Sequence, residues 1–459
     1  MKISNFRRHM ADLSVKFGGL TFPRPVGVSS LAPVNSFDPE KLARTYEKHV
    51  EAGAGWVITG YTSDEMVHPP EKKPTYRFMR AESMGFGVHG LYGVADIGRI
   101  ITRLDTSRKI VNLLKQKELD VPIISSIMPP SGSIERWVKL AQTVVSFGYD
   151  AIELNIACPL STAEVGGVDQ FMKKNLPEIT GVMFGDVLEA VQSMAKEVVK
   201  SVSIPVGCKL DPQTGYPRFV ALASALKECG IKWVTTISSP FTVVPPDIVN
   251  IGKPLWPMLD DNVPGAATGP WDKYLMQRDV AGIASFVPGL DIMGVGGIMD
   301  PTHVVETMML GAKAVAYSTG LIWNGRSVLR RSIEFLSDYL DHHGLTLAEL
   351  SGLGLKYISA PELVDWKTDK LVAKIDGSAC SGCGICADNI CTALYMKDGV
   401  ADLVESDCTA CTMCVAICPE NAITIVDRKS GELVYKRSSS QDRFALSPKL
   451  WPKIEIPKV

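Results

Sequence analysis

Eight of the eleven cysteines in this 459-residue chain lie within one short segment, between residues 380 and 418. They form two runs. The first run consists of Cys380, Cys383, Cys386 and Cys391. The second run consists of Cys408, Cys411, Cys414 and Cys418, and Pro419 follows it. Each run opens with the spacing C-x2-C-x2-C, and the two runs begin 28 residues apart, so the segment is an internal duplication. Thiols this dense must bind metal or form disulfides, which decides how this part of the chain folds.

The spacing favours iron–sulfur clusters over disulfides, because a disulfide framework usually belongs to a small secreted domain. In two-cluster ferredoxins, each run of three cysteines binds one cube and the fourth cysteine crosses to the other cube. On that pattern one [4Fe-4S] cluster takes Cys380, Cys383, Cys386 and Cys418. The other [4Fe-4S] cluster takes Cys408, Cys411, Cys414 and Cys391. The alternative is a pair of four-cysteine zinc sites, but these join C-x2-C units across a longer gap.

The first run departs from the pattern at its end. Cys391 follows Cys386 after four residues rather than three, and no proline follows it. We therefore expect a bulged loop that still lets Cys391 reach its cluster. Two clusters in series form an electron path, so the first 345 residues should contain another redox centre.

The composition narrows the class of protein. Hydrophobic residues make up 46% and charged residues 21% of the chain, as in a soluble globular protein. The net charge of −2 gives no global electrostatic reason to bind nucleic acid or a membrane surface. The N-terminal segment MKISNFRRHMADLSVKFGGL has no long apolar run, so we expect neither a signal peptide nor a membrane span, and a cytoplasmic location.

Short apolar runs alternate with helical patterns along the N-terminal part. The runs are PVGVSSLAP (25–33), GWVITGYTS (55–63), VPIISSIMP (121–129), AIELNIACP (151–159), IPVGCKLDP (204–212), KWVTTISSP (232–240), LDIMGVGGI (290–298) and AVAYSTGLI (314–322). Eight strands each followed by a helix fit an α/β fold, the closed (β/α)8 TIM barrel. The alternative is an open doubly wound sheet, but no G-x-G-x-x-G follows the first run.

These patterns predict four parts of the chain. They are a barrel (1–345), a linker (346–375), a small ferredoxin-like α+β domain (376–427) and a C-terminal arm (428–459). The arm is rich in lysine and arginine and contains Leu450 and Trp451 near its end. We expect this arm to pack on a partner or on a second copy of the chain, giving an oligomer; a partly disordered tail is the alternative.

The seventh and eighth strands end in small residues, in GVGGI (294–298) and AYSTG (316–320). Barrels bind phosphate by the loops that follow these two strands. A pair of glycines can simply form a turn, but two such endings in the right order favour a phosphate. Together with the iron–sulfur segment, a phosphate site here predicts flavin mononucleotide (FMN).

These residues together resemble the dihydroorotate dehydrogenase-like flavoprotein family. The dihydropyrimidine dehydrogenase branch, in which an FMN barrel precedes a two-cluster ferredoxin segment, is the most similar. ELNIACP (153–159) resembles the family's fourth strand and CKLDP (208–212) its fifth. GVSSLAP (27–33) resembles the first flavin loop, and GVGGI its phosphate loop. The resemblance covers nearly the whole chain.

The resemblance implies a role for each matching residue. Ser29 and Ser30 would line the isoalloxazine ring, Asn155 would hydrogen-bond it, and Lys209 would stabilise the anionic reduced flavin. The phosphate would be held by Gly296, Gly297, Ser318 and Thr319. Hydride would pass between the flavin and one carbon of a C=C bond. Cys158 would be the catalytic acid/base at the neighbouring carbon. Alternatively, Cys158 is an inert small hydrophobic residue and Lys209 a structural ion-pair partner.

Several positions depart from the family pattern. Gly60 stands where the family has a flavin-contacting lysine, and Ala157 and Leu160 replace polar residues around Cys158. The loop PPSGS (129–133) and Ser238 replace substrate-binding asparagines. These amides read the edge of a pyrimidine, so their loss argues against orotate or uracil as the substrate.

Two long insertions, residues 64–103 and 241–270, are expected to cover the active site as loops. His89 in the first insertion could contact substrate, although a surface histidine is the simpler interpretation. No dinucleotide fingerprint occurs in the chain, so the resemblance implies an FAD- and NAD(P)H-binding subunit, or a ferredoxin, as electron partner. The alternatives are the same chemistry on a non-pyrimidine enone, enamide or thioester, and a non-catalytic electron-transfer subunit.

Overall fold

The structure is a computed structural model. It describes residues 11–30, 38–65, 76–80, 91–95, 102–157, 172–173, 184–211, 215–237, 240–242, 246–253, 265–359 and 361–437. These residues belong to two compact units, one that extends to Tyr357 and a second that begins at Ile358. Each unit is described by itself below.

The first unit is a (β/α)8 barrel, as predicted from the alternating pattern. Its eight strands are β3 (Val26–Val28), β4 (Val57–Ser63), β8 (Ile123–Ile127), β9 (Ala151–Asn155), β10 (Val206–Lys209), β11 (Trp233–Thr235), β14 (Asp291–Val295) and β15 (Ala314–Tyr317). Strands β4 to β15 pair in parallel in chain order, and β15 pairs with β3. Between β3 and β4 the amide of Gly55 donates to the carbonyl of Val26 at 2.9 Å. A two-residue strand, β7 (Thr102–Arg103), continues the sheet beside the end of β4.

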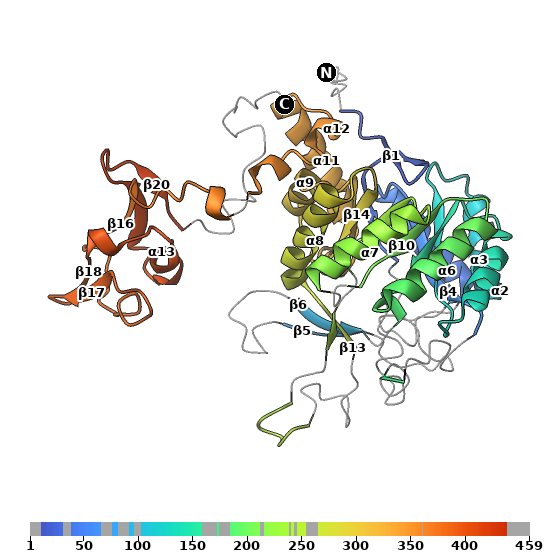
Figure 1. Cartoon of the computed structure of the whole chain (residues 1–459), viewed down its shortest axis with the longest axis horizontal. Coiled ribbons are helices and arrows are strands. Elements are labelled where there is room, and N and C mark those ends of the chain that lie inside the picture. The colour runs from blue at the N-terminus through green and yellow to red at the C-terminus, as the bar shows by residue number, and fades with distance from the viewer. Residues whose placement is uncertain are drawn as a thin grey trace, which may run out of the picture. The chain divides into compact units, whose positions relative to one another are not determined.

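Helices follow the strands and form the outer layer in Figure 1. They are α1 (Pro39–Glu51), α2 (Leu104–Lys115), α3 (Ile134–Val145), α6 (Leu188–Ser201), α7 (Tyr216–Glu228), α8 (Lys273–Phe286), α9 (Pro301–Met309), α10 (Thr319–Asn324), α11 (Ser327–His343) and α12 (Leu347–Leu350). Local sequence sets where two of them begin. Asp38 caps α1 by accepting from the amides of Glu40 and Lys41, and Asp300 caps α9 by accepting from Thr302.

Aromatic side chains close the amino-terminal end of the barrel. A hairpin of β1 (Val15–Phe17) and β2 (Leu20–Phe22) packs Phe17 and Phe22 into the core. The ring of Phe22 stacks on Trp56 with centroids 4.8 Å apart, and Phe17 contacts Trp233. The amide of Gly18 donates to the side chain of Asp291, the first residue of β14. Because these aromatic side chains fill the amino-terminal end of the barrel, the candidate active site is sought at the carboxyl-terminal ends of the strands.

The two insertions contain strands as well as loops. They form one antiparallel sheet of four strands in the order β12 (Phe241–Thr242), β13 (Gly265–Thr268), β6 (Leu91–Ala95), β5 (Tyr76–Arg80). Strand β6 from the first insertion pairs with β13 from the second. The insertions follow β4 and β11, so this sheet belongs to the carboxyl-terminal end of the barrel (Figure 1). The expectation of loops alone was therefore wrong for these segments.

In its described residues, up to position 437, the second unit has two small sheets and one short α-helix. The first sheet contains β16 (Leu371–Ile375), β19 (Ile423–Asp427) and β20 (Leu433–Tyr435). The second sheet contains β17 (Leu394–Lys397) and β18 (Val400–Leu403), and the helix is α13 (Met413–Ile417). Cys386, Cys414 and Cys418 are buried in the core of this unit, against apolar residues such as Val415 and Ile425.

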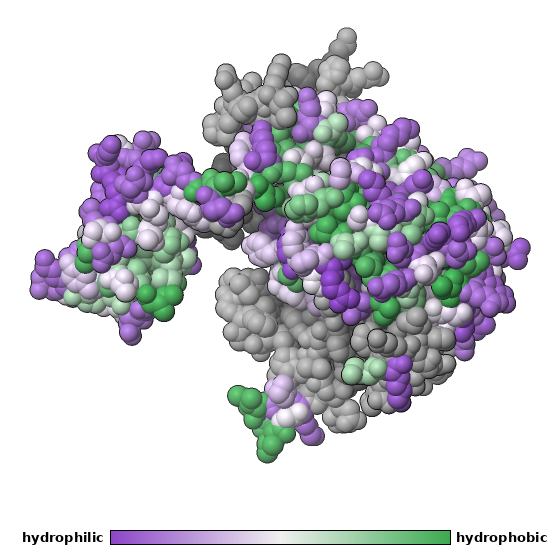
Figure 2. All heavy atoms as spheres, in the orientation of Figure 1, coloured by the Kyte–Doolittle hydropathy of each residue, from purple (hydrophilic) through white to green (hydrophobic). Residues whose placement is uncertain are grey.

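Short 3-10 turns complete the described secondary structure. They are η5 (Pro270–Asp272), η6 (Leu355–Tyr357), η7 (Pro361–Leu363) and η8 (Glu405–Asp407). Figure 2 shows polar and apolar residues mixed over the visible face, with a green tip at residues 246–253 of the second insertion. There Ile248, Val249 and Ile251 are 83–95% exposed. In the described part of the chain, no helix has the length and apolar character to cross a membrane.

Candidate active site and cluster loops

Small and polar residues from four strand ends line one cavity at the carboxyl-terminal end of the barrel. The lining residues are Ser29, Lys209, Ile237, Asp272, Val295, Gly296, Gly297, Ile298, Ser318 and Thr319. Six of them are residues for which the sequence implies a flavin contact. Residues separated by up to 290 positions in the chain thus converge as the barrel topology requires.

One end of the cavity carries the single lysine of its lining. Lys209, the last residue of β10, is half-buried, and its Nζ donates to Ser30 Oγ at 3.4 Å. Ser29 is held against β15, because its amide donates to the carbonyl of Tyr317 at 3.0 Å. Asn155 ends β9 opposite Lys209 in the ladder, and its Oδ1 accepts from the amide of Ala157 at 3.2 Å. A cation and hydrogen-bonding side chains therefore lie at the carboxyl-terminal ends of β3, β9 and β10.

The other end of the cavity is a cradle of small residues. Gly296 and Gly297 have φ values of +127° and +63°, which favour glycine. A side chain at Gly297 would start 2.7 Å from Cα of Lys273, so the loop has room only for backbone. The loop leads into α9, whose amino-terminal end is capped by Asp300. With Ser318 and Thr319 beside it, this cradle fits a phosphate group.

Glu153 is a buried carboxyl next to this site that the sequence analysis did not single out. It is fully buried on β9 and accepts a hydrogen bond from Thr235 Oγ1 on β11. Burial raises the pKa of Glu153, while the positive charge of Lys209 lowers it. Glu153 is the first residue of the ELN motif, which was the signal available in the sequence.

Strand β4 bulges at Gly60, the position where the resemblance implies a lysine in the family. Its φ is +92°, and a side chain there would start 2.6 Å from the amide of Thr62. The register with β8 shifts between Thr59 and Thr62. The amide of Gly60 donates to Tyr46 Oη at 3.3 Å. The local backbone therefore excludes a side chain at this position in the middle of β4.

Several residues of interest have no described structure. Cys158, the expected acid/base, lies outside the described residues, as do Leu160, Ser238 and His89. Of the other two cysteines of the barrel, Cys208 belongs to the core and Cys229 is only partly buried. Cys208 is buried, and burial raises the pKa of its thiol well above the ordinary value. Cys229 donates from Sγ to the carbonyl of Gln192 at 3.4 Å.

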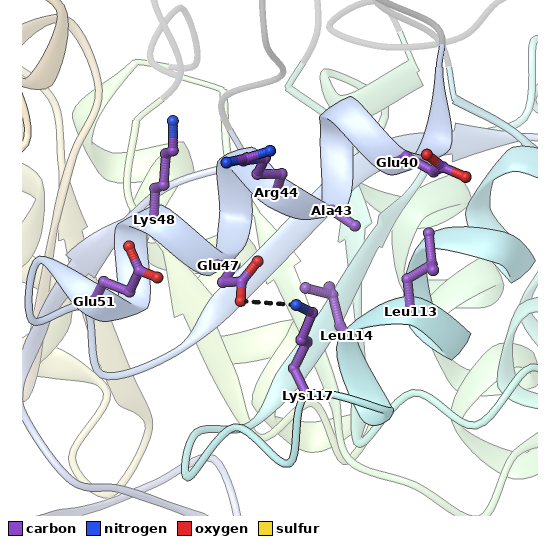
Figure 3. A pocket seen from close by; sticks show the side chains of 9 residues that line it. All are labelled: Glu40, Ala43, Arg44, Glu47, Lys48, Glu51, Leu113, Leu114 and Lys117. Atoms are coloured by element: carbon purple, nitrogen blue, oxygen red, sulfur yellow. Dashed lines mark ion pairs between the residues drawn. The ribbon is translucent and has the colours of Figure 1, made fainter.

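A second hollow lies on the outside of the barrel, between α1 and α2 (Figure 3). Its wall carries both signs of charge, including Glu40, Arg44 and Lys48. Glu47 and Lys117 pair across it at 3.2 Å. Because barrel chemistry occurs at the carboxyl ends of the strands, this outer groove is not the candidate active site.

In the second unit, the loop that carries the first cysteine run, residues 380–391, is called the first cluster loop here. It borders a small cavity. Four cysteines line it: Cys380, Cys383, Cys386 and Cys418. The first three come from one run and the fourth from the other, which is the crossed arrangement that the ferredoxin pattern implies. Burial raises the pKa of Cys386, and the neighbouring thiols of Cys418, Cys380 and Cys383 raise it further.

The second cluster loop, residues 408–418, brings together the other four cysteines of the segment. Burial raises the pKa of Cys414 to about 11, and the nearby thiols of Cys408, Cys411 and Cys391 contribute. Cys391, after the longer spacer of the first run, therefore reaches the second loop. Its amide donates to Asn389 Oδ1 at 2.8 Å, which fixes the extra residue in the turn.

The two loops share an unusual backbone. In the first loop Gly382 and Gly384 have φ values of +70° and +75°. In the second loop the equivalent residues are Ala410 and Thr412, with φ values of +53° and +67°. A left-handed conformation costs a residue with a side chain about 1–2 kcal/mol. The second loop keeps the left-handed conformation of the first although it lacks glycine at these two positions.

Backbone amides in this unit point at the sulfurs. Ala373 and Ala410 donate to Cys408 Sγ, both at 3.4 Å, and Ala422 donates to Cys418 Sγ at 3.3 Å. Such hydrogen bonds tune an iron–sulfur cluster. Within the described residues, no three His, Cys, Asp or Glu side chains converge on a single metal ion. A [4Fe-4S] cube binds four thiolates, and four cysteine residues line the cavity of the first cluster loop.

Comparison with known families gives two matches. Residues 12–340 match the family model described as dihydroorotate dehydrogenase. Residues 401–424, around the second cysteine run, match the 4Fe-4S binding domain. Together the two matches span the barrel and the second cluster loop.

Curated proteins of similar sequence include the PreA subunit of NAD-dependent dihydropyrimidine dehydrogenase from Escherichia coli (strain K12). It is 26% identical over 380 residues, which cover 82% of this chain and 84% of that protein. The chloroplastic NADP(+) dihydropyrimidine dehydrogenase of Arabidopsis thaliana is 26% identical over 78% of this chain and 80% of its own length. A putative dihydroorotate dehydrogenase A (fumarate) of Aeropyrum pernix is 29% identical over 72% and 92%.

Proposed function

The chain belongs to the dihydroorotate dehydrogenase family and carries a 4Fe-4S binding domain, and on this premise we propose that it is an FMN-dependent oxidoreductase acting on CH–CH bonds. We propose further that two [4Fe-4S] clusters carry its electrons to or from a partner. The observation that most supports the FMN-dependent function is the cavity lined by Lys209, Ser29 and the glycine cradle that follows β14.

In this proposal the chain's own residues hold and polarise the cofactor. The cradle of Gly296 and Gly297, with Ser318 and Thr319, binds the phosphate, and Ser29, Ser30 and Asn155 contact the ring. When bound, FMN supplies two-electron exchange with a carbon of the substrate. Lys209 holds a positive charge at the ring end of the cavity, where it stabilises negative charge that develops during reduction. Cys158 gives or takes the proton at the neighbouring carbon.

The cluster loops would hold two cubes in the crossed arrangement. Cys380, Cys383, Cys386 and Cys418 bind one. Cys408, Cys411, Cys414 and Cys391 bind the other. When bound, the clusters supply one-electron transfer. The E. coli relative is named as a subunit of an NAD-dependent enzyme. For this chain we propose a separate FAD- and NAD(P)H-binding subunit, or a ferredoxin, as the electron partner.

The substrate is proposed only as a small molecule with a C=C or CH–CH bond. Dihydropyrimidines are the first class to test, because two relatives are named for this activity. The bulge at Gly60 and the loop 129–133 favour testing a second class, enones, enamides and thioesters. These positions lack the lysine and the amide that the related sequences place there.

The test begins with protein purified without oxygen. We expect about one FMN and about eight irons per chain. Dihydropyrimidines and a panel of saturated ring and acyl compounds are then screened for bleaching of the flavin absorbance, and enoyl compounds are screened for restoring the absorbance of the reduced flavin. Cys158→Ala should abolish turnover while flavin and iron contents stay unchanged, and Cys229→Ser is the matched cysteine control. If no compound bleaches the flavin and Cys158→Ala does not change turnover by the complete complex, the catalytic proposal fails in favour of an electron-transfer subunit.

Lys209→Met tests the electrostatic role directly. Removing the cation should lower the reduction potential of the flavin and slow reduction by about 100-fold, since preorganised charge contributes on this scale. Lys232→Met, on the loop before β11, is a matched control because Lys232 does not line the cavity. Equal potentials in both variants would remove Lys209 from the mechanism.

A further inference from the structure

Asp272 is an acidic residue inside the cavity that no part of the proposed chemistry uses. It ends the turn η5 and precedes α8, and only 3% of it is exposed. The residue lines the cavity together with Gly296, Gly297, Ser318 and Thr319. Among the residues that the structure describes, Oδ1 of Asp272 has no hydrogen-bond partner. A buried carboxyl oxygen without a partner is costly, so a ligand that satisfies it is to be expected.

The charges around this end of the cavity do not neutralise Asp272. Among the described residues, the charged groups on the surrounding elements are Lys209, Lys273, Arg278, Asp279, Asp300, His303 and Glu306, of which Arg278 pairs with Asp279. Lys273 Nζ lies 2.9 Å from Glu306 Oε2, and His303 Nε2 lies 3.1 Å from Asp300 Oδ2. Lys209 instead donates to Ser30. Burial alone raises the pKa of Asp272 well above its ordinary value, with no cation opposing it.

A protonated carboxyl group has a different use from a carboxylate. It has one O–H donor, and a phosphate oxygen is a strong acceptor. An ionised carboxylate beside a phosphate would instead place two like charges together in a buried cavity. The backbone of the glycine cradle lines the same cavity as Asp272. A neutral carboxyl group there would add one hydrogen-bond donor to a phosphate site.

Building on the proposed FMN site, we propose that Asp272 is a phosphate-binding residue whose neutral carboxyl group donates a hydrogen bond to the phosphate of the flavin nucleotide. The phosphate accepts this bond without any covalent step. FMN affinity then depends on pH: ionising Asp272 removes the donor and adds a repulsion. Riboflavin, which lacks the phosphate, does not sense Asp272.

The experiment uses the full chain with its flavin removed. FMN and riboflavin are titrated by quenching of their fluorescence, with the wild type, Asp272→Asn and Asp272→Ala. An amide can still donate, so Asp272→Asn should bind FMN within about threefold of the wild type. Asp272→Ala should bind FMN about 10- to 100-fold more weakly, the loss expected for a hydrogen bond to a charged group. All three proteins should bind riboflavin equally.

A pH series supplies a second readout. FMN binding to the wild type should weaken as pH rises, whereas Asp272→Asn should show a flatter profile. Asp279→Asn is the matched control: Asp279 is also a buried carboxyl of this region, but it pairs with Arg278 and does not line the cavity. Circular dichroism checks folding, and the wild-type and Asp272→Asn pH profiles decide the question if Asp272→Ala does not fold.

Three outcomes overturn the proposal: FMN affinity unchanged in Asp272→Ala, equal losses for FMN and riboflavin, or Asp272→Asn as weak as Asp272→Ala. If the wild type binds neither FMN nor riboflavin, the proposed flavin site fails together with it. If the wild type binds FMN and only the Asp272 effects are missing, the flavin site stands and this inference alone fails.

Discussion

Replacing Gly297 by alanine tests whether the cradle at the end of β14 has room for backbone only. Two costs are expected. The left-handed φ of +63° costs alanine about 1–2 kcal/mol. The added methyl group would also start 2.7 Å from Cα and 2.8 Å from Cβ of Lys273, and overpacking of this kind costs about 1–3 kcal/mol. The free energy of unfolding of the barrel should therefore fall by about 2–5 kcal/mol.

Gly344 provides the matched control. It ends α11 with a φ of +64°, almost the same as Gly297, but nothing lies within 4 Å of an added methyl group. Gly344→Ala should therefore cost only the backbone part, about 1–2 kcal/mol. Urea unfolding followed by circular dichroism measures both variants, and FMN titration should show lost affinity only for Gly297→Ala. Equal losses of stability in the two variants would refute the steric argument for the cradle.

Three further predictions concern other parts of the molecule. Cys418→Ser and Cys391→Ser should each leave about four of eight irons, and electron paramagnetic resonance should show a different cluster lost in each; loss of the same cluster would contradict the crossed arrangement. Ala410→Gly should stabilise the second unit by about 1 kcal/mol in thermal unfolding, whereas Gly382→Ala should destabilise it, since its methyl group would start 2.5 Å from the carbonyl of Gly399. Burial lowers the pKa of His49 to about 4, below its unfolded value near 6.5. The free energy of unfolding of the barrel should therefore be full above pH 6.5 and fall by roughly 2–3 kcal/mol towards pH 4, where the unfolded state binds the proton more readily. His49→Asn should flatten this pH profile of stability, and an unchanged profile in the variant would contradict the prediction.

The sequence was sufficient for the barrel because its signals are local. Each apolar run that was read as a strand contains one, from β3 at Val26 to β15 at Tyr317. Their order around the barrel follows from the short, right-handed connections of β/α units. The same regularity brings Ser29, Lys209 and Gly297 to one cavity, although they are far apart in the chain.

The sheet built by the two insertions could not be read in this way. Strand β6 finds its partner β13 about 170 residues later, and the segments LYGVA and GAAT are short and only weakly patterned. The residues of strand β16 were likewise predicted to belong to the linker. The segment LVAKI is short, and its place in the second unit is set by pairing with β19, which lies about 50 residues later in the chain. Asp272 lacks a sequence signal for a related reason: its burial arises from the closure of the barrel around it.

The shared ladder of β6 and β13 makes the two insertions a single structural unit. A deletion in either one would leave the other with an open edge, so neither can be lost or exchanged alone without unravelling its neighbour. Altered substrate preference within this lineage should then arise by paired changes at residues far apart in the gene, and grafting experiments should transfer both segments at once.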